Sequence, residues 1–247
     1  MSSIHQYLVW SHIVLGSVAL VLLWVPALAR KGSRLHVVAG RWYVYSMYGV
    51  CVTALVTSLM VLADPLGVRQ PGQTFTAERA AELASIYRMF SLFLLMLAVL
   101  VFVSIRHGLL ALEARRRPDV LTAPLHRLSV YALAALAVPV GVLGLVDRQW
   151  LLVIFAGISL NVAFAMWRDL RIETPDARQL VGMHLGGLIG SGIGAYTAFF
   201  AFGGSTFFGE FLPGQWQVIA WVTPPIVGSI LSARMHRKYG PRPAAAG

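Results

Sequence analysis

Long apolar runs separated by short polar segments dominate this sequence. A helix needs about 20 apolar residues to cross the roughly 30 Å hydrocarbon core of a bilayer, and the runs have about that length. A β-barrel would instead show segments of about ten residues in which apolar and polar positions alternate. The pattern therefore predicts seven membrane-spanning helices, at residues 7–28, 40–63, 86–105, 128–146, 149–167, 180–202 and 215–233.

Polar residues beside these runs predict how two of the helices begin and end. Thr76 is a suitable N-cap, and Glu78 would follow it in the positively polarised first turn. We therefore expect the third helix to start well before its apolar run and to continue through Tyr87 and Arg88. The fourth and fifth runs are separated only by a turn at Asp147 and Arg148, which predicts an antiparallel helical hairpin.

The positive charges lie mainly on one side of the predicted bundle of spans. Of the 20 Lys and Arg residues, 16 fall after the first, third, fifth and seventh spans. The opposite side holds only Arg69, Arg79, Arg88 and Arg148. Because positive residues are retained on the cytoplasmic side, this bias predicts that the N-terminus is outside and the C-terminus cytoplasmic.

The composition agrees with a membrane protein. Hydrophobic residues make up 57% of the chain and charged residues 12%, which is more apolar surface than a soluble domain of this length could bury. The fold class we predict is an all-α integral membrane protein, a seven-transmembrane-helix bundle. A single domain would span residues 1–240, followed by a disordered tail at 241–247.

The formal net charge of +10 follows from the topology, so we expect the lipid bilayer as the partner and no nucleic acid. The chain has one cysteine, Cys51, which lies inside a predicted span and excludes a disulfide framework.

The sequence contains no nucleophile elbow, phosphate loop or zinc-protease motif. Catalytic residues therefore cannot be assigned, and whether the protein is an enzyme stays open.

Histidines are the main ionisable residues at or within the predicted bilayer boundary. Such groups are costly in a membrane and are functional candidates by default. His12 lies near the outer end of the first span. His36, His107, His126 and His184 lie at or near the cytoplasmic ends of four other spans, where a helical bundle could gather them around haem or a metal.

Two of these histidines share a local pattern with a glycine one turn later. His12 precedes Gly16 and His36 precedes Gly40, so ring and glycine lie on the same helical face. The space beside the ring could admit a flat macrocycle such as haem. It could equally let another helix approach, which is the commoner outcome.

The sixth span carries an unbroken ridge of small residues. Gly182, Gly186, Gly190 and Gly194 recur every four residues. Such a ridge favours close approach of another helix, in a homo-oligomer or with a membrane-protein partner, and less often of a ligand.

One extended motif carries a resemblance to a known family. It runs Lys31-Gly32-x-x-x-His36-x-x-x-Gly40-Arg41-x-Tyr43, preceded by His12-x-x-x-Gly16 and followed by Met47. With the stretch from Arg178 through His184 to Phe199, it resembles an uncharacterised family of small bacterial multi-pass membrane proteins known only as a domain of unknown function. The resemblance implies a bacterial inner-membrane protein with recurrent transmembrane histidines, and it implies no activity.

Three hypotheses about function remain. In the first, His36, His126 and His184 hold haem b or a transition metal for a redox role, with His107 as a metal ligand and His12 in a second site. A purified protein with no Soret band, no bound metal and no response to haemin would leave this idea without support. In the second, the protein is a small-molecule or ion permease with protonatable histidines. In the third, it is a non-catalytic scaffold or assembly factor that binds through the glycine ridge.

Overall fold

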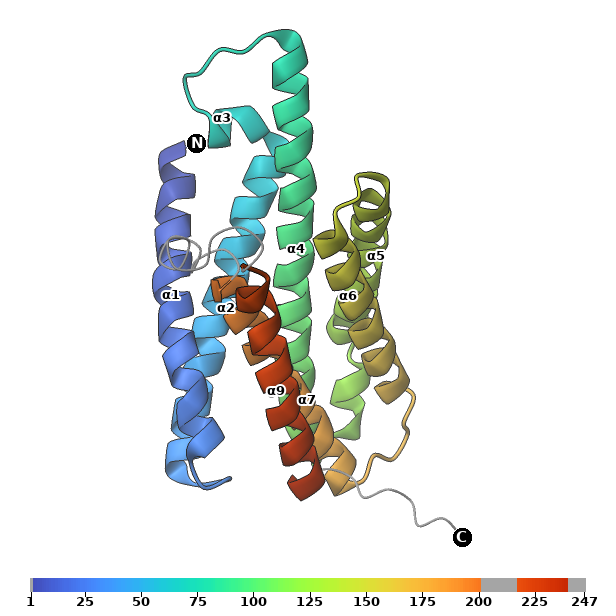
Figure 1. Cartoon of the computed structure of the whole chain (residues 1–247). Coiled ribbons are helices and arrows are strands. Elements are labelled where there is room, and N and C mark those ends of the chain that lie inside the picture. Colours follow the sequence, from blue (N-terminus) through green and yellow to red (C-terminus); the bar gives the residue numbers. More distant parts are fainter. Residues whose placement is uncertain (1, 201–216, 240–247) are drawn as a thin grey trace. The chain divides into compact units, whose positions relative to one another are not determined.

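The structure is a computed structural model that describes residues 2–200 and 217–239, and every regular element in those ranges is helical (Figure 1). The elements are α1 (Ser2–Leu28), α2 (Arg34–Ala63), α3 (Pro65–Arg69), α4 (Ala77–Glu113), the 3₁₀ helix η1 (Pro118–Thr122), α5 (Pro124–Val146), α6 (Trp150–Asp169), α7 (Ala177–Ala198) and α9 (Gln217–Tyr239). The predicted tail at 241–247 lies outside the described residues, as do the end of the sixth predicted span and the start of the seventh.

The apolar runs predict where helices form but not how far they extend. For example, α2 begins at Arg34 rather than at residue 40, because the Ser33 side chain caps it by accepting a hydrogen bond from the backbone N–H of His36 at 3.3 Å. Similarly, α4 continues past its apolar run to Glu113. Hydropathy marks the part of a helix that lipid can cover, whereas caps and polar ends lie beyond it.

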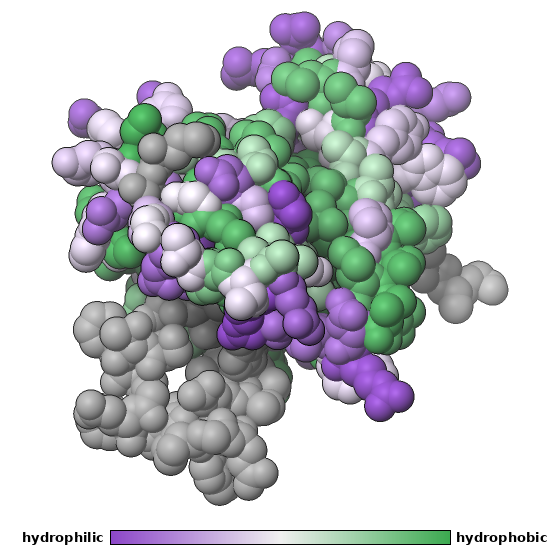
Figure 2. Space-filling view, turned by 90° about the horizontal axis from the view of Figure 1, so that it is seen from above, coloured by the Kyte–Doolittle hydropathy of each residue, from purple (hydrophilic) through white to green (hydrophobic). Residues whose placement is uncertain are grey.

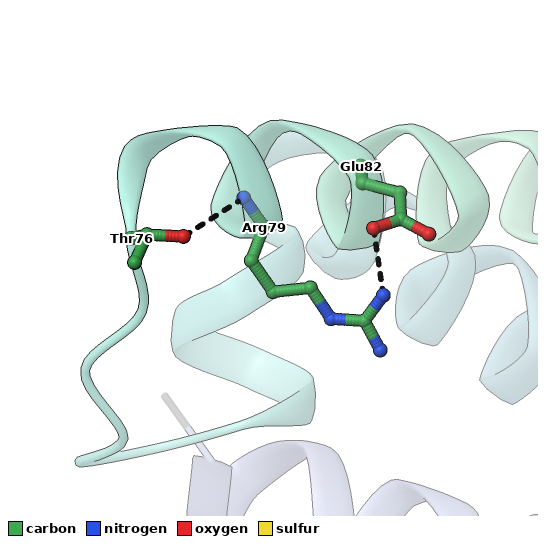
Figure 3. Close-up of polar contacts among 3 residues, drawn as sticks. All are labelled: Thr76, Arg79 and Glu82. Carbon is green, nitrogen blue, oxygen red and sulfur yellow. Dashed lines mark hydrogen bonds and ion pairs between the residues drawn. The ribbon is translucent and has the colours of Figure 1, made fainter.

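The start of α4 confirms the prediction made from Thr76. Its hydroxyl oxygen accepts a hydrogen bond from the backbone N–H of Arg79 at 3.3 Å. One turn later, Arg79 and Glu82 form an ion pair at 2.6 Å (Figure 3). Both side chains of that pair are 55% exposed, so we attribute the start of this helix to the cap rather than to the ion pair.

Within residues 2–200 and 217–239, five helical segments are long and apolar enough to cross a membrane, which confirms the all-helical, membrane-compatible class. They are Ser3–Leu28, Arg34–Ala63, Ala77–Glu113, Pro118–Val146 and Trp150–Asp169. Only 6% to 39% of the residues in their most apolar stretches are buried inside the protein, so most of this apolar surface needs lipid. Hydrophobic residues cover much of the face that Figure 2 shows, with patches of hydrophilic residues among them.

The chain divides into two compact units. The first comprises Met1–Phe102 and Leu128–Met166, and the second comprises Val103–Arg127 and Trp167–Gly247. In the first unit, α1 packs along α2 (Figure 1). The core of this unit contains the fully buried side chains of Tyr43, Met47, Phe93, Met96, Leu133 and Val140.

The predicted hairpin between α5 and α6 is present in the first unit. Arg148 has φ 55°, the left-handed conformation that ends many helices. The backbone N–H of Gln149 then donates to the carbonyl of Gly144 at 2.8 Å, which satisfies one of the last carbonyls of α5. The two-residue turn at 147–148 therefore reverses the chain.

In the second unit, the end of α4, η1 and the start of α7 share a small apolar core. Its buried members are Ala111, Ala114, Val120, Leu121, Leu180 and Met183. Asp176 caps α7 by accepting from the backbone N–H groups of Arg178 and Gln179, at 2.7 and 2.8 Å. The Gln179 side chain accepts in return from the Asp176 backbone N–H, which completes a capping box.

Candidate functional site

The second unit brings two histidines and one aspartate into a chain of hydrogen bonds. His107 Nδ1 lies 3.1 Å from His126 Nε2, and His107 Nε2 lies 3.2 Å from Asp169 Oδ2. The centroids of the two imidazole rings are 5.3 Å apart, and the rings are inclined by 30°. His107 therefore joins Asp169 to His126 through both of its ring nitrogens.

Three helix ends deliver these side chains. His107 lies in the C-terminal part of α4, His126 lies in the first turn of α5, and Asp169 is the last residue of α6. Pro124 can begin α5 because the first N–H groups of a helix have no partner within it. The site depends on the polar extension of α4 beyond its apolar run, since that extension carries His107.

The two ends of this row of hydrogen bonds, Asp169 and His126, differ in burial. The His107 and His126 residues are 3% and 0% exposed, whereas the Asp169 side chain is 18% exposed. A cavity of about 290 Å³ lies beside the Asp169 end, since its lining includes Leu170, the next residue along the chain. Water therefore reaches the Asp169 carboxylate more readily than it reaches His126.

The carboxylate sets the tautomers of both rings. When Asp169 is ionised it only accepts hydrogen bonds, so His107 Nε2 must carry the hydrogen. A neutral His107 then presents a lone pair at Nδ1, and His126 Nε2 must donate to it. A neutral His126 in turn presents a lone pair at its own Nδ1.

Two buried nitrogen atoms at this site have no hydrogen-bond partner among the described residues. They are Nδ1 of His126 and Nε of Arg106. Arg106 directly precedes His107 in α4, and its charge interacts electrostatically with the ring of His126. Leaving a buried donor or acceptor unsatisfied costs about 1–3 kcal/mol. These two atoms are therefore the unused hydrogen-bonding capacity of the site.

His184 joins α7 to the same stretch of α4. Its Nδ1 lies 3.0 Å from the carbonyl oxygen of Gly108, the residue after His107. Gly187, nearly one turn later, packs directly on α4. A Cβ atom there would lie 3.0 Å from Gly108 Cα and still closer to the carbonyl oxygen of Ser104. The two glycines allow the backbones to approach and hold His184 beside α4.

The other two predicted site histidines lie in the first unit. His12 Nδ1 lies 3.2 Å from the carbonyl oxygen of Val50 and 3.1 Å from Thr53 Oγ1, which links α1 to α2. His36 Nδ1 lies 3.0 Å from the carbonyl oxygen of Pro26. Each ring therefore makes a contact between the first two helices.

The end of α1 is held by a cation as well as by His36. Lys31 Nζ donates to the carbonyls of Pro26 and Ala27, at 2.8 and 2.7 Å. The last carbonyls of a helix have no partner within it and carry partial negative charge, so an ammonium group there is stabilising.

His12, His36 and His184 share one tautomer when neutral. A carbonyl oxygen only accepts, so Nδ1 of each ring carries the hydrogen and Nε2 carries the lone pair. Metal-bound histidines are usually oriented in this way, with the second nitrogen donating to a carbonyl or carboxylate. His12 and His36 therefore keep the ligand chemistry that the sequence predicts, whereas both nitrogens of His107 are engaged.

The predicted space beside two histidines is faced by a neighbouring helix. A Cβ atom on Gly16 would lie 3.9 Å from Val50, and one on Gly40 would lie 3.9 Å from Pro26. Both distances are ordinary van der Waals contacts between α1 and α2. The glycines of both motifs therefore favour helix packing over room for a macrocycle.

The ridge of α7 is only partly covered. Gly186 and Gly190 are exposed and Gly182 and Gly194 are half-buried, and a Cβ atom on Gly190 would meet no atom of the described residues within 4 Å. The close contact with α4 uses Gly187, which lies outside the ridge. The ridge remains a predicted surface for a partner helix.

Sequence reasoning missed Asp169 and Arg106 as site residues. The predicted fifth span ended at Trp167 and the third at residue 105, so both residues were assigned to loops. The orientation did contain a signal, because it placed both residues on the cytoplasmic side with His107 and His126. A carboxylate beside two histidines on one side of a membrane is a candidate partner for them.

No protein-family model, curated protein or solved structure matches this chain. Within the described ranges, no group of three or more His, Cys, Asp or Glu side chains is arranged to hold a metal ion. The interpretation of the site therefore rests on its own geometry.

Proposed function

We propose that this protein is a proton-handling permease of the bacterial inner membrane, in which Asp169, His107 and His126 pass protons to and from a buried site. The observation that carries the proposal is the hydrogen-bonded chain of these three residues, which ends at a buried ring nitrogen that has no partner in residues 2–200 and 217–239. Ionisable groups linked in this way are typical of proton relays in membranes.

The relay follows from the tautomers. A proton that binds His126 Nδ1 allows the hydrogen on His126 Nε2 to move to His107 Nδ1. The hydrogen on His107 Nε2 then moves to Asp169, from which water can take it. Each step forms one N–H or O–H bond and breaks one, and imidazole suits this role because it both gives and accepts protons near neutral pH. The same steps in reverse carry a proton inward.

The membrane topology we propose has seven spans, with α7 and α9 completing the five apolar helices. Six glycines lower the hydropathy of α7, which accounts for its weaker apolar character. The excess of positive charge after odd-numbered spans places the N-terminus outside and the relay on the cytoplasmic side. Asp169 would then exchange protons with the cytoplasm.

Single-cysteine labelling tests this orientation. The only native cysteine, Cys51, is buried, and Cys51→Ala gives a cysteine-free background. In that background we expect an impermeant maleimide to label Gln73→Cys in intact spheroplasts and to label Arg116→Cys only after permeabilisation. Both positions are exposed and lie outside the helices. Labelling in the opposite order would overturn the orientation.

Proton uptake into proteoliposomes tests the relay. Uptake driven by a potassium diffusion potential is recorded with an internal pH dye, first alone and then with small anionic, cationic or neutral solutes outside. We expect Asp169→Asn to slow protein-dependent uptake at least about tenfold, because an amide cannot relay the proton and general acid–base groups contribute factors of about 10²–10⁴.

Asp119→Asn is the matched control. This aspartate lies in η1 with a side chain that is 75% exposed, so the same chemical change should leave uptake unaltered. Uptake at the wild-type rate in Asp169→Asn, or no protein-dependent uptake under any of these conditions, would refute the relay.

A haem or metal protein is the second candidate. It is favoured by the shared tautomer of His12 and His36, which presents Nε2 as an electron-pair donor. The absorption spectrum of the purified protein separates the two candidates, because only bound haem would produce a Soret band.

A further inference from the structure

We infer that Arg106 and His126 together bind the carboxyl group of a small monovalent carboxylate, which enters the site with one proton. The inference rests on the proposed function in that the relay supplies this proton. It begins from the two buried nitrogens that have no partner among the described residues, Arg106 Nε and His126 Nδ1.

The hydrogen-bonding capacities of the two atoms define the ligand. Arg106 Nε–H can only donate, and His126 Nδ1, in the tautomer set by Asp169 and His107, can only accept. A protonated carboxyl group offers the complementary pair, since its C=O oxygen accepts and its O–H donates. A bare carboxylate would match only the arginine, and an ammonium group would match only the histidine.

Charge balance supports the same ligand. The charged and titratable groups recorded around this ring are Arg106, His107 and Asp169. With both rings neutral, Arg106 and Asp169 balance each other. A monovalent anion bound alone would add an uncompensated charge to a buried site, which is costly. An anion that arrives with one proton leaves the net charge unchanged, so binding and proton uptake should be coupled one to one.

The site also explains why Arg106 is an arginine in the polar extension of α4. Arginine presents several N–H groups in a fixed planar arrangement that suits carboxyl recognition, whereas lysine is a flexible point charge. Arg106→Lys therefore keeps the charge but removes the Nε–H donor. It should weaken binding even where the fold and the local charge are preserved.

Isothermal titration calorimetry with acetate, on the detergent-purified full chain, tests the inference. Titrations in two buffers of different ionisation enthalpy give the number of protons taken up. We expect acetate to bind with uptake of about one proton, and we expect the neutral ester methyl acetate, which lacks the O–H donor, to bind at least about tenfold more weakly. Arg106→Lys and Arg106→Gln should each raise the Kd for acetate at least about tenfold, since a hydrogen bond to a charged group contributes about 1.5–3 kcal/mol.

Arg116→Gln is the matched control, because it removes the same charge from an exposed position in the same unit. Unchanged acetate binding in that variant supports the assignment, and thermal melts confirm that each Arg106 variant is folded. The inference is overturned if acetate does not bind, if methyl acetate binds equally well, if no proton is taken up, or if folded Arg106→Lys binds like the wild type. Those outcomes leave the proton-uptake result for Asp169→Asn untouched, so failure of the ligand and failure of the relay are separable.

Discussion

Gly187→Ala is expected to destabilise the protein by at least about 1–3 kcal/mol, the usual cost of overpacking a close contact. The new methyl group would lie 3.0 Å from Gly108 Cα, 2.9 Å from Gly108 N and still closer to the carbonyl oxygen of Ser104. All three are backbone atoms of α4, so the contact cannot be relieved by rotation of a side chain. We expect a clear fall in the melting temperature of the detergent-purified protein.

Gly190→Ala is the matched substitution in the same helix. A Cβ atom there meets no atom within 4 Å in the described part of the chain, and alanine favours helix over glycine by about 0.5–1 kcal/mol. Its melting temperature should therefore be unchanged or slightly raised. Equal melting temperatures for the two variants would show that α7 does not pack on α4 through Gly187.

His107→Gln and His107→Leu are expected to separate the two roles of the central histidine. Glutamine can still donate to Asp169 and accept from His126, but it cannot relay a proton. Leucine leaves both partners unsatisfied, at about 1–3 kcal/mol for each buried group. We therefore expect both variants to lose most proton uptake, by at least about tenfold, and only His107→Leu to melt substantially lower than the wild type.

The comparison is made on one set of purified proteins, with thermal melts in detergent and proton uptake in proteoliposomes. A His107→Gln variant that takes up protons at the wild-type rate would remove His107 from the relay. A His107→Leu variant as stable as the wild type would instead show that its two hydrogen bonds contribute little to folding.

The helices of this protein were predictable because hydropathy and caps are local properties. The apolar runs located every long helix, Thr76 marked the start of α4, and the turn at 147–148 marked the hairpin. The polar extension of α4 was not predictable from hydropathy, since Arg106 and His107 resemble loop residues by composition. In the part of the chain that the structure describes, five helices meet the criteria for a membrane span, and the predicted total of seven stays a prediction.

The candidate site was only partly predictable, because it depends on which helix ends are neighbours. Orientation placed His107, His126 and His184 on one side, and the structure brings His107 and His126 into direct contact. Nothing in the local sequence selects Asp169 as their partner. The glycine that approaches α4 is likewise Gly187 rather than a member of the regular ridge, because packing depends on the direction a residue faces as well as on its spacing.

The pairing of α1 with α2 has a consequence for how the chain enters the membrane. Lys31 and His36 satisfy the last carbonyls of α1, and His12 bonds to Val50 and Thr53. All of these partners belong to the first 63 residues, so these particular hydrogen bonds can form before later segments are synthesised. The hairpin can therefore leave the translocon with these bonds already made, and the following helices are added against it.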